Sequence, residues 1–150
     1  LEQFYQICYL GHRCCNIGLN FNGNIFVIIK DKFTMNLASI SENRNNEKRI
    51  AVTPEIAKKY IDLDLNLYLP NNYGSHLGFS DDDYRNLGVN FFENEEEVIK
   101  NSEIIIQIGL PNDNKLSLLK ENQTLIGSLN AFSNKQKIES LKLKKINCFS

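Results

Sequence analysis

The stretch that decides the fold is residues 45–55, NNEKRIAVTPE, which pass from a polar loop into a strong helix start. Thr53 suits the N-cap of a helix and Pro54 suits its first turn. The strand-like segment 36–40 comes shortly before them. The order strand, loop, helix predicts that Arg49 lies at the rim where open α/β sheets bind ligands. The alternative is a loop arginine in a surface salt bridge.

Outward from this stretch, short apolar runs alternate with amphipathic stretches. We predict strands over 24–30, 36–40, 65–69, 89–92, 103–108, 124–129 and 146–149, and helices over 54–62, after Ser80, and over 95–101, 114–120 and 134–144. The run 103–108 is apolar on both faces, which is typical of a central parallel strand. Strands separated by helices of this length predict an α/β fold with a mostly parallel sheet. The last predicted strand reaches the end of the sequence, so we expect a domain that is incomplete at its C-terminus.

The composition is typical of a folded, soluble domain. Of the 150 residues, 42% are apolar and 23% are charged. The net charge of −1 gives no basic excess for nucleic acid or an anionic membrane. The longest apolar run, Ile25–Ile29, is far shorter than the ~20 residues of a membrane span.

Residues 1–34 differ from the rest of the chain. They lack a start methionine and hold Cys8, Cys14 and Cys15. The cysteine spacing favours free thiols in a reducing compartment over a zinc site or a disulfide framework. We predict that Met35 is the natural start, that residues 1–34 are a leader outside the native domain, and that residues 35–150 form the domain. The alternative is a genuine N-terminal extension.

Residue types that carry catalysis are sparse. His76 lies in a glycine-flanked loop, which favours a solvated histidine, and His12 lies in the predicted leader. No Gly-x-Gly-x-x-Gly motif follows a strand. The acidic runs 81–83 and 95–97 fit the first turns of helices, where acids complement the helix dipole, better than a cation site. We predict no metal site.

Two polar residues stand near the ends of predicted strands. Gln107 is a lone polar residue in the apolar run 103–108, and Ser128 has a comparable place in the run 124–129. A buried amide without partners costs about 1–3 kcal/mol, so we expect something to contact Gln107. Strand-end polarity and a ligand-facing role remain open for both residues.

Several segments resemble one known family in order and spacing. Residues 35–40, the Arg-x-Ala-x-Thr-Pro element that begins at Arg49, the segments 102–111 and 125–129, and residues 146–150 resemble the N-terminal domain shared by alanine dehydrogenase and the alpha subunit of proton-translocating NAD(P) transhydrogenase. Residues 73–79 and the acids that follow look like the transhydrogenase branch. The resemblance runs from Met35 to the end. It implies a three-layer Rossmann-like or flavodoxin-like domain, truncated at its C-terminus.

Departures from the family pattern favour the transhydrogenase branch. In alanine dehydrogenases, an arginine of the first motif and a lysine after the apolar strand bind the keto acid, and a histidine after the next strand serves in acid–base chemistry. Arg49 matches the arginine, but Gln107 and Ser128 hold the lysine and histidine positions. Neither residue can take up those roles. The resemblance therefore implies no catalytic residue, and Arg49, Gln107 and Ser128 as cofactor-side residues of the rim.

For the whole protein, the resemblance implies the soluble NAD(H)-binding component of a transhydrogenase. NAD(H) would be bound mostly by residues beyond this chain, and NADP(H) by a partner component. A homodimer would dock onto that component and a membrane proton channel, on the cytoplasmic side of a bacterial inner membrane or the matrix side of a mitochondrial one. The isolated chain would be inactive. Two alternatives are the N-terminal domain of an alanine- or saccharopine-type dehydrogenase and a non-catalytic α/β binding module.

Overall fold

A computed structural model describes residues 5–9, 13–19, 25–29 and 34–150 and divides the chain into two units, Leu1–Thr34 and Met35–Ser150. In the first unit, the antiparallel strands β1 (Tyr5–Tyr9), β2 (Arg13–Leu19) and β3 (Ile25–Ile29) pair in the order β1-β2-β3. The strand β3 lies within the predicted 24–30, whereas β1 and β2 were not predicted. The predictions for His12 and for the thiols of Cys8, Cys14 and Cys15 fall outside the described residues and side chains. That residues 1–34 are a leader stays a prediction.

The second unit is built on one parallel sheet. Its strands are β4 (Asn36–Ala38), β5 (Asn66–Pro70), β6 (Asn90–Phe92), β7 (Ile104–Ile106), β8 (Thr124–Ile126) and β9 (Asn147–Phe149). They pair in the order β6-β5-β4-β7-β8-β9, and every pair is parallel. The predicted fold class, α/β and Rossmann-like, is confirmed, and the sheet is wholly parallel where we expected a mostly parallel one.

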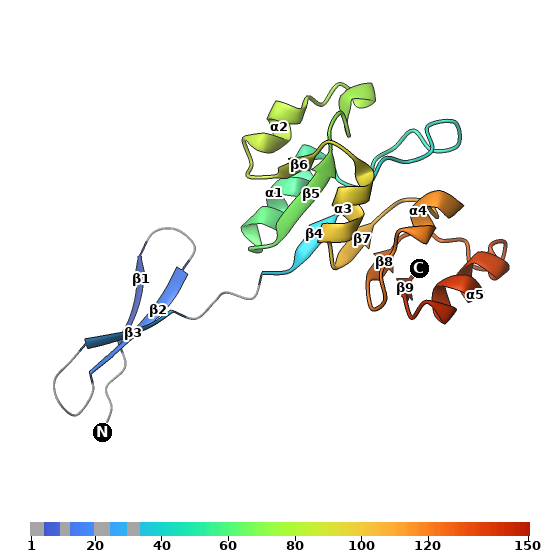
Figure 1. The fold of residues 1–150 in the computed structure, drawn as a ribbon. Helices are drawn as coiled ribbons and strands as arrows, with labels where there is room; N and C mark the ends of the chain where they lie inside the picture. Colours follow the sequence, from blue (N-terminus) through green and yellow to red (C-terminus); the bar gives the residue numbers. More distant parts are fainter. Residues whose placement is uncertain (1–4, 10–12, 20–24, 30–33) are drawn as a thin grey trace. The chain divides into compact units, whose positions relative to one another are not determined.

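Helices cover both faces of this sheet (Figure 1). They are α1 (Pro54–Asp62), α2 (Asp81–Arg85), α3 (Glu95–Asn101), α4 (Asp113–Ser117) and α5 (Lys135–Leu143), with a 3₁₀ turn, η1, at Ser75–Leu77. The helices α1 and α2 pack on the face that carries Leu37 and Leu67. The helices α3, α4 and α5 pack on the face that carries Ala38 and Ile105. Because side chains alternate along a strand, neighbouring residues feed opposite cores, and three layers result.

The helix ends follow local sequence signals. Thr53 Oγ1 accepts a hydrogen bond from Ile56 N at the start of α1, as predicted. Ser80 and Asp83 form a capping box at the start of α2. The strand β8 ends at Ile126, before the end of the predicted 124–129, and the backbone of Gly127 just beyond it comes close to that of Gln107.

The sheet order fixes where a ligand can bind. The strand β4 has β5 on one side and β7 on the other, so the chain adds β5 and β6 on one side of β4 and then returns to add β7, β8 and β9 on the other. At such a switch point the loops that follow the two strands diverge and leave a crevice at their carboxyl ends. In the described part of the chain, no helix has the length and apolar character needed to cross a bilayer.

Candidate functional site

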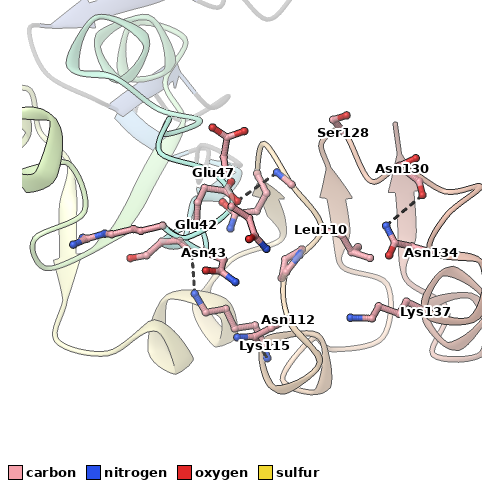
Figure 2. Close-up of a pocket in the computed structure, with 16 residues that line it drawn as sticks. Glu42, Asn43, Glu47, Leu110, Asn112, Lys115, Ser128, Asn130, Asn134 and Lys137 are labelled. Carbon is pink, nitrogen blue, oxygen red and sulfur yellow. Dashed lines mark hydrogen bonds between the residues drawn. The ribbon is translucent and has the colours of Figure 1, made fainter.

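A cleft of about 720 Å³ opens at the carboxyl ends of β4, β7 and β8. Three segments supply its walls: residues 41–47 after β4, residues 107–115 after β7 and residues 128–137 after β8. Figure 2 shows Glu42 and Glu47 on one wall, Leu110 between the walls, and Asn134 and Lys137 on the other. The cleft therefore lies at the switch point that the sheet order defines.

Glu42 ties two of these walls together. Its Oε1 accepts a hydrogen bond from Ile108 N at 2.6 Å, and its Oε2 accepts one from Gly109 N at 3.4 Å. Burial raises the pKa of Glu42 above its ordinary value of 4.5, even though both backbone donors act in the opposite direction. The carboxylate thus holds the loop after β4 against the chain after β7.

A second cluster fixes Ser41 at the cleft. Lys115 Nζ lies 2.7 Å from Glu95 Oε2 and donates to the carbonyl oxygen of Ser41 at 2.7 Å. Glu95 Oε1 accepts from Ser41 N at 2.9 Å. Both backbone polar groups of Ser41 are held, and the charge of Lys115 is balanced by Glu95. This cluster gives the cleft a rigid wall.

Arg49 is bound to a neighbouring glutamate. Its Nε and Nη2 donate to the two carboxylate oxygens of Glu47 at 2.9 and 2.7 Å, while 76% of its side chain stays exposed. The Arg49 guanidinium lowers the pKa of Glu47 to about 2. Arg49 lines a second hollow, of about 540 Å³, together with Glu47, Gly109 and Ser128. A surface salt bridge is thus what the structure shows, and a ligand-side role for Arg49 stays a prediction.

Gln107 is buried and has the partner that its position demanded. It is 3% exposed, and its Oε1 accepts a hydrogen bond from Ser39 Oγ at 3.0 Å. Ser39 Oγ lies 2.7 Å from Tyr73 Oη, which in turn accepts from Val52 N at 3.2 Å. Burial raises the pKa of Tyr73 to about 12, so this hydroxyl stays protonated at neutral pH.

The structure brings some predicted site residues together and adds others. Gln107 and Ser128 line the 720 Å³ cleft, and Ser128 also lines the hollow that holds Arg49. Sequence reasoning missed Glu42 and Tyr73. Glu42 stands two residues beyond the predicted strand 36–40, at the rim where open sheets bind ligands, which was the available signal. Tyr73 begins the loop segment 73–79 that carries the family resemblance, but no pattern in the sequence gave its side chain a role in the site.

Other candidates have structural roles. His76 Nε2 lies 2.8 Å from the carbonyl oxygen of Lys48, so it joins two loops. The acids 81–83 stand in the first turn of α2, as predicted, and Asp81 accepts from Asn72 N. No group of three His, Cys, Asp or Glu side chains that could hold a metal ion is found among the residues that the structure describes.

The described residues fit one end of a dinucleotide better than the other. Beside charged side chains of both signs, the cleft presents amide and hydroxyl groups that suit a polar ring substituent or carboxylate. The connection from β4 to α1 contains no glycine. The Thr53 side chain already accepts a hydrogen bond from the backbone N–H of Ile56 at the start of α1. A pyrophosphate would need such free N–H groups at a glycine-rich turn. The described part of the chain therefore lacks a pyrophosphate cradle between β4 and α1.

The strand order and the switch-point cleft define an open, Rossmann-like α/β domain with a crevice for a ligand. Residues 39–150 match the family described as the N-terminal domain of alanine dehydrogenase/PNT. The chain belongs to this family, which is of the oxidoreductase type.

Relatives from both branches resemble the chain. Alanine dehydrogenase 1 of Staphylococcus aureus, strain N315, is 28% identical over 107 residues, which are 71% of this chain and 28% of that protein. The solved structure of an L-alanine dehydrogenase superposes with a TM-score of 0.71 at 18% identity, over 76% of this chain and 31% of that one. The transhydrogenase from Sinorhizobium meliloti gives a TM-score of 0.68 at 18% identity, over 75% of this chain and 34% of that one.

The chain spans about 28% of the length of the curated relatives that it matches. At 18% identity, the two structural likenesses establish the fold alone. The activity of the whole protein is a matter for the proposal that follows.

Proposed function

We propose that this chain is part of the NAD(H)-binding component of a proton-translocating NAD(P) transhydrogenase, in its alpha subunit. The observation that carries the proposal is the pair of residues at the ends of β7 and β8. Gln107 and Ser128 line the cleft there, and neither side chain carries a charge or exchanges protons near neutral pH. Transfer of a hydride between two nicotinamides needs no group of that kind.

The reaction balances without a proton from this chain. Bound NADH and NADP⁺ supply the donor and the acceptor, and a hydride with its electron pair passes from one nicotinamide to the other, giving NAD⁺ and NADPH. The residues described here position the ligand and exclude water. Glu42 and the Lys115–Glu95 pair hold the cleft walls in place for that purpose.

The proposal extends to the whole assembly. NAD(H) would be held mostly by residues outside this chain, which agrees with the lack of a pyrophosphate cradle between β4 and α1. The component would act as a homodimer at the cytoplasmic face of the inner membrane, or at the matrix face in a mitochondrion. It would dock onto an NADP(H)-binding component and a membrane component that conducts protons. The isolated chain would be inactive.

An amino-acid dehydrogenase of the alanine or saccharopine type is the second candidate. Two observations favour it: the 28% identity to Staphylococcus aureus alanine dehydrogenase 1 and the hollow that Arg49 lines together with Ser128. In this case Arg49 would exchange the Glu47 carboxylate for that of a keto acid. The dehydrogenase would need its proton-transfer group from elsewhere in the protein.

One pair of assays on the complete protein separates the two candidates. We expect NADPH-dependent reduction of an NAD analogue and no reduction of NAD⁺ by L-alanine. The reverse result would replace the transhydrogenase with the dehydrogenase. Absence of both activities in a folded protein that binds neither nicotinamide cofactor would leave the non-catalytic module as the better account.

A further inference from the structure

A buried chain of hydrogen bonds ends at the side-chain amide of Gln107. It runs from Val52 N to Tyr73 Oη at 3.2 Å, from Tyr73 Oη to Ser39 Oγ at 2.7 Å, and from Ser39 Oγ to Gln107 Oε1 at 3.0 Å. Ser39, Tyr73 and Gln107 are 0%, 1% and 3% exposed. Because the hydroxyls of Ser39 and Tyr73 are buried, each hydroxyl proton needs an acceptor within the chain.

Counting protons fixes the direction of the chain. Val52 N–H can only donate, so the oxygen of Tyr73 accepts from it. With the Gln107 oxygen toward Ser39, the Ser39 hydroxyl donates to Gln107 and the Tyr73 hydroxyl donates to Ser39, and every proton is used. With the amide reversed, Gln107 would donate to Ser39 and Ser39 to Tyr73. The Tyr73 proton would then have no acceptor among the described residues, at a cost of about 1–3 kcal/mol.

The amide nitrogen of Gln107 is consequently presented to the cleft. Gln107 lines the cleft, and its Nε2 donates to no residue in the described part of the chain. Among the described residues, every fully buried side-chain nitrogen or oxygen has a partner. Since Nε2 has none, it is open to the cleft, and its two N–H groups are free to meet a ligand.

We propose that Gln107 binds an oxygen acceptor of the ligand through Nε2, and that Tyr73 and Ser39 are positioning residues for this amide. A neutral N–H donor selects a carbonyl-type oxygen, as in a carboxamide or a carboxylate, by hydrogen-bond geometry. The inference rests on the proposed function, which places the reacting end of a ligand in this cleft. It adds the atom that recognises that end and the buried residues that aim it.

The direct test is a titration of the ¹⁵N-labelled 150-residue chain, with nicotinamide or pyruvate at millimolar concentration, followed by NMR. We expect the side-chain NH₂ signals of Gln107 to shift with a probe that also shifts the backbone amides of Ser128 and Asn130. A shift with nicotinamide identifies a carboxamide as the acceptor, and a shift with pyruvate alone identifies a carboxylate. Both support the role of Gln107.

The negative outcomes separate this inference from the proposed function. Backbone shifts at Ser128 and Asn130 without a shift of the Gln107 NH₂ signals would overturn the role of Gln107 and leave the use of the cleft intact. No shift at any cleft residue with either probe would overturn the role of Gln107 and count against ligand binding in this cleft.

Variants test the positioning role of the buried chain. Tyr73→Phe removes the proton that Ser39 accepts, so the amide loses its fixed direction. We expect a dissociation constant about 3- to 10-fold weaker for the probe, the range of one neutral hydrogen bond, and a smaller NH₂ shift of Gln107. Ser39→Ala breaks the same chain with a smaller change in volume, and it serves if the phenylalanine variant does not fold.

The matched control is Tyr84→Phe. Tyr84 is also fully buried in the same core, and its hydroxyl donates to the carbonyl oxygen of Val52 at 3.0 Å, outside the chain that ends at Gln107. It should cost stability and leave both the affinity for the probe and the NH₂ signals of Gln107 unchanged. Equal effects of Tyr73→Phe, Ser39→Ala and Tyr84→Phe on these two readouts would overturn the positioning role.

Discussion

Gly127 permits the close approach of β8 to the segment after β7. A Cβ placed on Gly127 would lie 2.3 Å from the carbonyl oxygen of Gln107 and 3.1 Å from its carbonyl carbon. Both atoms belong to the backbone and cannot move aside as a flexible side chain would. We expect Gly127→Ala to lower the free energy of unfolding by about 3 kcal/mol, at the upper end of typical overpacking costs, as measured by urea denaturation.

Gly109→Ala is the matched control for this prediction. Its added Cβ would lie 3.6 Å from Glu42 Oε2, an ordinary van der Waals distance. We expect a change of less than about 1 kcal/mol. Equal destabilisation by the two substitutions would show that the approach to the Gln107 carbonyl is not what requires glycine at residue 127.

The pair Arg49–Glu47 gives a pH-dependent prediction. The folded pKa of Glu47, about 2, lies below its ordinary value of 4.5, mainly because the Arg49 guanidinium bonds to the carboxylate. A depressed carboxyl pKa stabilises the fold above pH 4.5, and this contribution is lost as the pH falls toward 2. We expect Arg49→Gln to return the pKa of Glu47 toward 4.5, as measured by ¹³C NMR titration of the carboxyl group.

In the same titration, Glu55 provides an internal control. The hydrogen bond and charge of Lys59 lower its pKa, and Arg49 plays no part in that shift. The pKa of Glu55 should therefore be the same in the parent and in Arg49→Gln. An unchanged pKa of Glu47 in the variant would contradict the pairing that the structure shows.

At the scale of the site, the sequence indicated that Gln107 needs a partner but not which one. Ser39 lies 68 residues earlier in the chain and approaches Gln107 only because β4 and β7 are neighbours in the sheet. The position of Tyr73 depends on how its loop packs against Val52, which no local pattern encodes. Residues that act through such distant contacts could not be found from periodicity and spacing.

Among the helices, α2 is short and depends on its cap. Ser80 Oγ accepts from Asp83 N at 3.3 Å, and the Asp83 carboxylate accepts from Ser80 N at 2.7 Å. We expect Ser80→Ala to lower the free energy of unfolding by about 1 kcal/mol, as measured by denaturant titration.

The control for the cap is Ser140→Ala, within α5. The Ser140 hydroxyl donates to the carbonyl oxygen of Lys137 at 2.7 Å and caps no helix start. We expect its effect to stay within about 0.5 kcal/mol. Should the two substitutions cost the same, the capping box would have no special part in the stability of α2.

Element boundaries show why some predictions were more accurate than others. The predicted ranges 54–62 and 95–101 coincide with α1 and α3, because the caps Thr53 and Asn94 are local signals. The predicted strand 36–40 ends earlier, at Ala38, because the length of a strand depends on partners elsewhere in the chain. Local chemistry thus defined these two helices, whereas α4 ends at Ser117, three residues before the end of the predicted 114–120.

For the molecule as a whole, we propose that residues 35–150 fold without residues 1–34. Both hydrophobic clusters draw all their described members from residues 37–146. We expect the chain shortened to residues 35–150 to unfold in one cooperative transition, with the free energy that this unit has in the full chain. Circular dichroism during denaturant titration measures it. A shortened chain that fails to fold would favour a genuine N-terminal extension.

A chain shortened further, to residues 41–150, is the control. It lacks β4, the strand that joins the two halves of the sheet, and should not give a cooperative transition. The strand order itself was beyond sequence reasoning. Alternating strands and helices indicated a parallel sheet, but many orders of six strands satisfy that pattern. The structure adds the order, in which β4 lies beside β7 and a helical layer packs on each face.

The position of β4 between β5 and β7 has a consequence for folding during synthesis. Leu37 pairs with Ile104, so one edge of β4 stays unpaired during synthesis until residues 104–106 have left the ribosome. Until then, the nascent β4-β5-β6 half exposes an unpaired edge to other chains, the situation in which strands aggregate. The docking of β7 closes this edge and brings two of the three cleft walls together, and the third wall follows β8. A polypeptide that terminates before residue 104 therefore keeps an aggregation-prone strand edge and lacks a complete cleft for a ligand.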